Sequence, residues 1–83
     1  MIVVHLRGAL DRYEARTGER LTHEELAERT GLSRPTLDSI ASRRDYNASL
    51  RTIERICRAL RCSPGDLLEL VEDEEHQDEE ALG

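Results

Sequence analysis

The sequence predicts an all-α domain of five helices, and three observations carry that prediction. Apolar residues recur at the spacing of one helical face in successive segments of this 83-residue chain. A serine or threonine precedes most of these segments, where it can cap a helix, and a glycine follows the first two. Phenylalanine and tryptophan are absent, so the core has to be built from aliphatic side chains on helices.

The chain begins with a short apolar segment, residues 1–5, which is β-branched and predicts a brief strand. A first helix is expected over residues 6–17. Its apolar positions follow the i, i+3, i+4, i+7 pattern, and Gly18 supplies the stop. These inward positions are Leu6, Ala9, Leu10 and Tyr13.

A second helix is expected over residues 22–30. Thr22 and Glu25 stand three positions apart, so the hydroxyl can cap the helix start while the carboxylate reaches back to the Thr22 amide. Gly31 follows the last turn, where a left-handed residue without Cβ can end the helix. The chain is therefore expected to turn sharply at Gly31.

A third helix is expected over residues 33–43, with Ser33 as its cap and Pro35 in the first turn, where a missing N–H costs nothing. The residues expected to face the core are Leu37, Ile40 and Ala41. A loop follows, because the next residues lack periodicity. Two short helices joined by a glycine turn are the pattern of a helix-turn-helix.

A fourth helix is expected over residues 49–61, capped by Ser49, and it is the most clearly amphipathic segment of the chain. Its apolar stripe is expected to consist of Leu50, Ile53, Ile56, Cys57 and Leu60. The exposed arginines of this helix are expected to be solvated or paired with glutamates.

A short fifth helix is expected over residues 64–70, because Ser63 and Asp66 repeat the capping logic around Pro64. Extended chain is expected to follow from Leu70. Two short apolar segments at opposite ends of the domain favour a small antiparallel ribbon, formed either within one chain or between chains.

The charge of the chain is segregated. Residues 1–66 hold all 12 basic residues, every one an arginine, and 10 acidic ones, whereas residues 67–83 hold 8 acidic residues and no basic one. We therefore expect one domain over residues 1–71 and an acidic, disordered tail over residues 72–83. The net charge of -6 understates how much positive charge the domain carries locally.

The tracts LSRPTL and, at the right distance, LRTIERICRALRCSPGDLL carry a family resemblance. Residues 6–71 resemble the Xre/Cro-type helix-turn-helix family of phage repressors and bacterial regulators, and the apolar first strand is similar to that of its small stand-alone members. The resemblance implies a lambda-repressor-like helix-turn-helix domain that binds specific sequences of double-stranded DNA. It makes residues 1–71 the DNA-binding domain and the third helix the recognition helix.

In such a pair, the second helix lies in the major groove with its N-terminal residues at base edges. The outward residues of the third helix are the expected base contacts, namely Arg34, Pro35, Asp38, Ser39 and Ser42. Arg34 is the first choice, since a guanidinium can pair with guanine O6 and N7. Asp38 either accepts from a cytosine amino group or forms a salt bridge with Arg34 four residues away, and we favour the salt bridge.

Phosphate contacts are expected on both sides of the recognition helix. The start of the second helix offers backbone amides and a positive dipole end, and the loop before the fourth helix offers positive charge. The expected phosphate contacts are Thr22, His23, Ser33, Thr36, Arg43, Arg44, Asn47 and Ser49.

These features predict a transcriptional regulator, acting as a homodimeric repressor on an inverted-repeat operator. The candidate dimer surfaces are the strand at residues 2–4 and the faces of the fourth and fifth helices. One alternative is an antitoxin that binds its own operator and contacts a toxin through the acidic tail or the edge of the fifth helix. The tail could also bind another basic protein. A second alternative is an adaptor that uses the helix-turn-helix surface to bind protein. The tail itself could compete with DNA for the basic surface of the domain.

Other classes of function find little support in the sequence. No acid, base and nucleophile set suggests an enzyme, and we expect no cofactor and no metal site. Cys57 and Cys62 are expected to be structural thiols, because a cytosolic setting disfavours a disulfide and no second cysteine pair or nearby histidine completes a metal site. The chain has no apolar run long enough to span a membrane and no apparent signal peptide, so a cytoplasmic location is expected.

Overall fold

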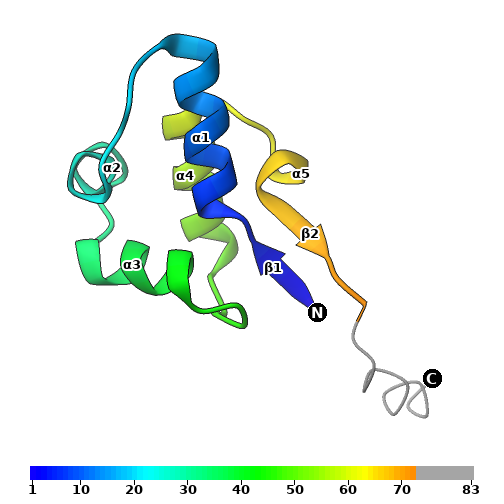
Figure 1. Ribbon diagram of the computed structural model, residues 1–83. Coiled ribbons are helices and arrows are strands. Elements are labelled where there is room, and N and C mark those ends of the chain that lie inside the picture. Colours follow the sequence, from blue (N-terminus) through cyan, green and yellow to red (C-terminus); the bar gives the residue numbers. More distant parts are fainter. Residues whose placement is uncertain (73–83) are drawn as a thin grey trace, which may run out of the picture.

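The computed structural model describes residues 1–72, and they form five helices and a two-stranded sheet (Figure 1). The elements are β1 (Ile2–Val4), α1 (Leu6–Thr17), α2 (His23–Thr30), α3 (Arg34–Ser42), α4 (Leu50–Leu60), α5 (Pro64–Leu67) and β2 (Leu68–Leu70). The predicted all-α class with short terminal strands is confirmed. The expected acidic tail lies outside the described residues, apart from Glu72.

The two strands pair within one chain. They run antiparallel, with Ile2 opposite Leu70, Val3 opposite Glu69 and Val4 opposite Leu68. Because β1 leads directly into α1 and β2 follows directly from α5, the ribbon ties the two ends of the described chain together (Figure 1). The His5 amide adds a hydrogen bond to the Leu67 carbonyl at 2.7 Å.

The core is aliphatic, as the composition requires. α1 and α4 lie side by side at its centre, α2 and α3 pack on one side, and α5 with the sheet packs on the other (Figure 1). The fully buried side chains come from every helix and are Leu6, Leu26, Leu37, Ile40, Ile56, Leu60 and Leu67. Truncating any one of them to alanine is expected to cost about 2–5 kcal/mol, a large share of the stability of so small a domain.

The predicted apolar stripe of α4 is wrong at its first position. Ile53, Ile56 and Leu60 are buried, but Leu50 is 84% exposed. Leu50 immediately follows the cap Ser49, and helical spacing from Ile53 leaves it at the edge of the stripe, beyond the reach of the other helices. The core therefore covers only part of the apolar face of α4.

The predicted fifth helix over residues 64–70 is too long. α5 ends at Leu67, and Leu68 takes up an extended backbone with φ -110° and ψ 149°. Pairing with β1 supplies backbone hydrogen bonds to residues 68–70, and this tertiary contact outweighs a short helix of few turns. The other helices end within one residue of expectation, because the expected ranges included the capping residues.

Candidate nucleic-acid interface

α2 begins and ends as its sequence demands. The Thr22 hydroxyl accepts a hydrogen bond from the Glu25 amide at 3.1 Å, and the Thr22 amide donates to the Glu25 carboxylate at 2.9 Å. Gly31 closes the helix in the left-handed region with φ +80°. The Thr30 hydroxyl, which is buried, donates to the Leu26 carbonyl at 2.8 Å and accepts from the Leu32 amide at 3.1 Å. The turn is thereby held from both sides.

α3 presents one buried face and one exposed face. Leu37 and Ile40 are buried in the core, while Arg34, Pro35 and Asp38 are exposed. Ser42 is also exposed, and Ser39 is half-buried. The Ser42 hydroxyl donates a hydrogen bond to the Asp38 carbonyl at 2.8 Å. Four of the five residues expected to contact bases are therefore exposed on α3, and Ser39 is only partly so.

Asp38 joins the two helices of the motif. The Nδ1 atom of His23, in the first turn of α2, donates to Oδ1 of Asp38 at 2.6 Å. The second carboxylate oxygen lies 3.8 Å from Nε of Arg34. The hydrogen bond from His23, followed by the charge of Arg34, holds the pKa of Asp38 below its ordinary value. The favoured salt bridge with Arg34 is present, but His23 is the closer partner.

Two hydroxyl pairs mark the starts of α3 and α4. Ser33 accepts from the Thr36 amide at 3.2 Å and donates its hydroxyl hydrogen to the Thr36 hydroxyl at 2.8 Å. Ser49 and Thr52 repeat the arrangement, with both distances at 3.0 Å. Each hydroxyl pair therefore leaves one hydroxyl hydrogen free to donate to a ligand at these helix starts.

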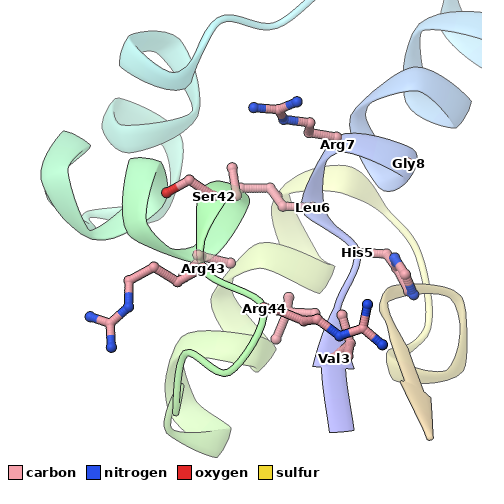
Figure 2. A pocket seen from close by; sticks show the side chains of 11 residues that line it. Val3, His5, Leu6, Arg7, Gly8, Ser42, Arg43 and Arg44 are labelled. Carbon is pink, nitrogen blue, oxygen red and sulfur yellow. The ribbon is translucent and has the colours of Figure 1, made fainter. Parts of the chain in front are cut away.

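The loop after α3 carries positive charge. The guanidinium of Arg43 lies over the ring of Tyr46, 5.7 Å from its centre, a cation–π contact that restrains the arginine. Figure 2 shows Arg43 and Arg44 leaving the end of α3 in opposite directions, with Arg44 extending towards His5. Asn47 is exposed in the same loop. The structure thus separates two arginines that the sequence analysis grouped together.

A hollow of about 250 Å³ lies between the start of α1 and the end of α3 (Figure 2). Arg7, Arg43 and Arg44 all line it. The sequence did not predict that Arg7 lies near the end of α3, because this closeness arises from tertiary packing and leaves no local pattern. The hydrogen bonds by which Thr30 holds the turn were not predicted either, although a threonine directly before a turn glycine is a usable signal.

The start of α2 leaves backbone amides available to a ligand. The capping box uses the amides of Thr22 and Glu25, which leaves the amides of His23 and Glu24 as the first-turn donors. A helix N-terminus of this kind favours phosphate through its amides and its dipole. The side chains of Glu24 and Glu25 oppose this attraction, so the amides rather than a net positive charge would hold the phosphate.

Other kinds of site receive no support from the described part of the chain. Residues 1–72 contain no cluster of three or more histidine, cysteine or carboxylate side chains placed to hold a metal ion. Cys57 and Cys62 are both free thiols. Among these same residues, no helix is both long enough and apolar enough to cross a bilayer.

Comparisons with known proteins show the family of the chain. Residues 19–73 match the family described as the Cro/C1-type HTH DNA-binding domain. The chain is 38% identical over 56 residues to YozG of Bacillus subtilis strain 168, an uncharacterised HTH-type transcriptional regulator; the match covers 68% of this chain and 67% of the relative. No solved structure shows significant similarity to the chain. The chain belongs to the family of Cro/C1-type helix-turn-helix DNA-binding domains and is a DNA-binding transcriptional regulator.

Proposed function

We propose that this regulator is a dimeric repressor that binds an inverted-repeat operator with one α3 helix of each protomer in the major groove. The observation that carries the proposal is the division of α3 into a buried apolar face and an exposed polar face, with Arg34 at the exposed N-terminal end. A recognition helix contacts base edges through its N-terminal residues. Arg34 is the first residue of α3 and so occupies such an N-terminal position.

Arg34 is the proposed principal base contact. Its guanidinium could pair with O6 and N7 of a guanine, a contact worth about 1–3 kcal/mol of discrimination against another base. Asp38, held by His23, lies close enough to restrain the Arg34 side chain. The remaining proposed base contacts are Pro35, by apolar contact with a thymine methyl, and the hydroxyls of Ser39 and Ser42.

Two phosphate clamps would flank the recognition helix. The first is the start of α2, through the amides of His23 and Glu24 beside the capping residue Thr22. The second is the loop and the start of α4, with Arg43 restrained by Tyr46. The proposed phosphate contacts besides these are Ser33, Thr36, Arg44, Asn47 and Ser49, and Arg7 joins them from the start of α1. About four phosphates per protomer would give a dimer a logarithmic salt slope on the order of -7.

Repression would follow when the protein occupies its operator. A protein bound across a promoter excludes polymerase without any chemical step, so no catalytic group is needed. A twofold dimer would place its two recognition helices about 34 Å apart, one helical turn of DNA, and hence would bind half-sites of inverted symmetry. This spacing distinguishes a dimeric repressor from a monomeric adaptor that binds another protein.

The test is the affinity of purified protein for fluorescent duplex DNA at low salt. The variant Arg34→Ala with Arg43→Ala should bind at least about tenfold more weakly than the wild type, because it loses one base contact and one phosphate contact. The matched control is Arg61→Asn, which removes a positive charge at the far end of α4 and keeps a residue that tolerates the φ of 53° found there. Equal affinity of the double variant and the wild type would contradict the proposed interface. An adaptor would show no DNA affinity to lose.

A further inference from the structure

An apolar groove of about 340 Å³ lies along α4, and no residue of α3 lines it. The groove is lined by Leu50, Ile53, Glu54, Cys57, Arg58, Cys62, Pro64 and Leu68. Leu50 begins α4, and its apolar side chain is 84% exposed to solvent. Cys62 and Pro64 follow the other end of the helix.

The apolar surface continues from the groove onto the sheet. Leu68 lines the groove, and Leu70, two residues further along β2, lies on the same face of the strand. Leu70 pairs with Ile2 of β1, and both are more than half exposed. The exposed large apolar residues of the described chain therefore gather beside α4 and at the sheet. Such a concentration marks a surface that another molecule covers.

The polar rim of the groove carries one acidic and one basic side chain. It is therefore complementary to a second copy of itself rather than to a partner of a single charge. Glu54 and Arg58 line it and form an ion pair, with Nε and Oε2 3.0 Å apart. They stand two residues on either side of Ile56. If two α4 helices packed antiparallel across a twofold axis at the level of Ile56, Glu54 of each protomer would face Arg58 of the other. An isologous interface requires this kind of self-complementary patch.

The two ends of the groove fit the same antiparallel arrangement. Leu50 begins α4, and Cys62 lies just beyond its last residue, Leu60. The exposed Leu50 side chain of one protomer would therefore meet the end of the groove formed by Cys57 and Cys62 of the other. A strongly acidic occupant, such as the tail of this chain, would meet Glu54 as well as Arg58, so the rim offers it no net attraction.

We infer that this groove is the dimer interface of the protein, and that its occupant is α4 of a second copy of the chain, packed antiparallel about a twofold axis. The inference deepens the proposed function, because the choice of a second copy rests on the twofold dimer that an inverted repeat requires. It can be tested without DNA, so its failure and that of the proposed function are distinguishable.

The first test is the mass of the full chain in solution, measured by sedimentation equilibrium without DNA. The wild type is expected at twice the chain mass of 9.5 kDa. Leu50→Glu should raise the dimer dissociation constant at least about tenfold, since it buries a carboxylate in an apolar contact. Arg51→Glu, the next residue along α4 and outside the groove, should leave the dimer intact. Circular dichroism checks that both variants are folded, which is expected because both positions are exposed.

A charge exchange between two variants tests the antiparallel pairing itself. Glu54→Arg alone and Arg58→Glu alone each place like charges opposite one another and should weaken self-association. Mixing the two variants should form a heterodimer, because every facing pair is then of opposite sign, and the variant with both substitutions should form a homodimer again. A monomeric wild type, a dimer unaffected by Leu50→Glu, or a mixture that does not associate would each overturn the inference.

Discussion

The imidazole of His23 and the carboxylate of Asp38 are joined by a hydrogen bond of 2.6 Å that links the first turn of α2 to the outer face of α3. The residues are 15 positions apart, and each belongs to a different proposed contact with DNA. The orientation of the proposed phosphate-binding turn and that of the proposed recognition helix are thus coupled. Because the carboxylate can only accept, the hydrogen of the imidazole bond must reside on Nδ1.

The first prediction concerns the pKa of the Asp38 carboxyl. It is lowered, chiefly by His23, so His23→Ala should raise it towards the ordinary value of about 3.9. A depressed pKa means that Asp38 contributes to stability above the pKa of the unfolded chain. This contribution is lost as pH falls through the pKa of the folded state. NMR titration of the Asp38 carboxyl in both proteins measures the shift, and an unchanged pKa in the variant would show that His23 is not its cause.

Truncation of Arg34 and truncation of Arg43 should affect DNA binding in different ways. Arg34→Ala should weaken binding about 5- to 150-fold at the operator and relax the preference at one base position, since it removes a base contact. Arg43→Ala should weaken binding to all duplexes alike and reduce the salt slope by about one, since it removes a phosphate contact. Titrations at several salt concentrations separate the two outcomes. If Arg43→Ala changed base preference, the assigned roles would have to be exchanged.

Two glycines offer a matched pair for stability. Gly31→Ala should destabilise the domain by about 1–2 kcal/mol, because φ is +80° there, and the conformation rather than crowding is the cause, since a Cβ would meet only Arg55 at 3.7 Å. Gly8→Ala lies inside α1, where the added Cβ has room, and should stabilise it by about 0.5–1 kcal/mol. Denaturant unfolding monitored by circular dichroism measures both. The same sign for the two changes would argue against the left-handed turn.

The thiol of Cys57 should be unreactive in the folded protein. Burial raises its pKa to about 11, so only about one molecule in a thousand carries the reactive thiolate at pH 8. Iodoacetamide at pH 8 should alkylate Cys57 much more slowly in buffer than in denaturant, as followed by mass spectrometry of digested protein. Equal rates in the two conditions would mean that the groove is open to reagents down to its base.

Removal of the acidic tail should tighten nonspecific binding. Residues 72–83 carry 7 carboxylate side chains and no arginine, and the whole chain has a net charge of -6. We expect truncation after Val71 to increase affinity for random duplex at low salt and to have less effect at high salt, where screening is strong. A tail that only aids solubility would leave the affinity unchanged at low salt.

Local signals in the sequence predicted the helices well, because caps and turn glycines act within a few residues. Thr22 and Ser33 cap their helices through their hydroxyls, and Gly31, which lacks a Cβ, forms the left-handed turn, as their residue types predict. The errors lie where distant segments decide the outcome. Residues 68–70 pair with β1 instead of extending α5, and the exposure of Leu50 depends on which neighbours reach it.

The candidate site shows the same division. The outward face of α3 follows from helical periodicity, so its residues could be predicted. The hydrogen bond of His23 to Asp38 and the approach of Arg7 to the end of α3 depend on how α1, α2 and α3 pack. No spacing within a single helix predicts either of these.

Selection of bound duplexes from a random DNA pool tests the central claim most directly, because it reports sequence preference, half-site identity and spacing together. The account predicts enrichment of an inverted repeat whose half-site centres are about 10–10.5 base pairs apart, with a guanine that Arg34→Ala no longer selects. A pool that shows no enriched sequence after repeated selection at low salt would contradict it.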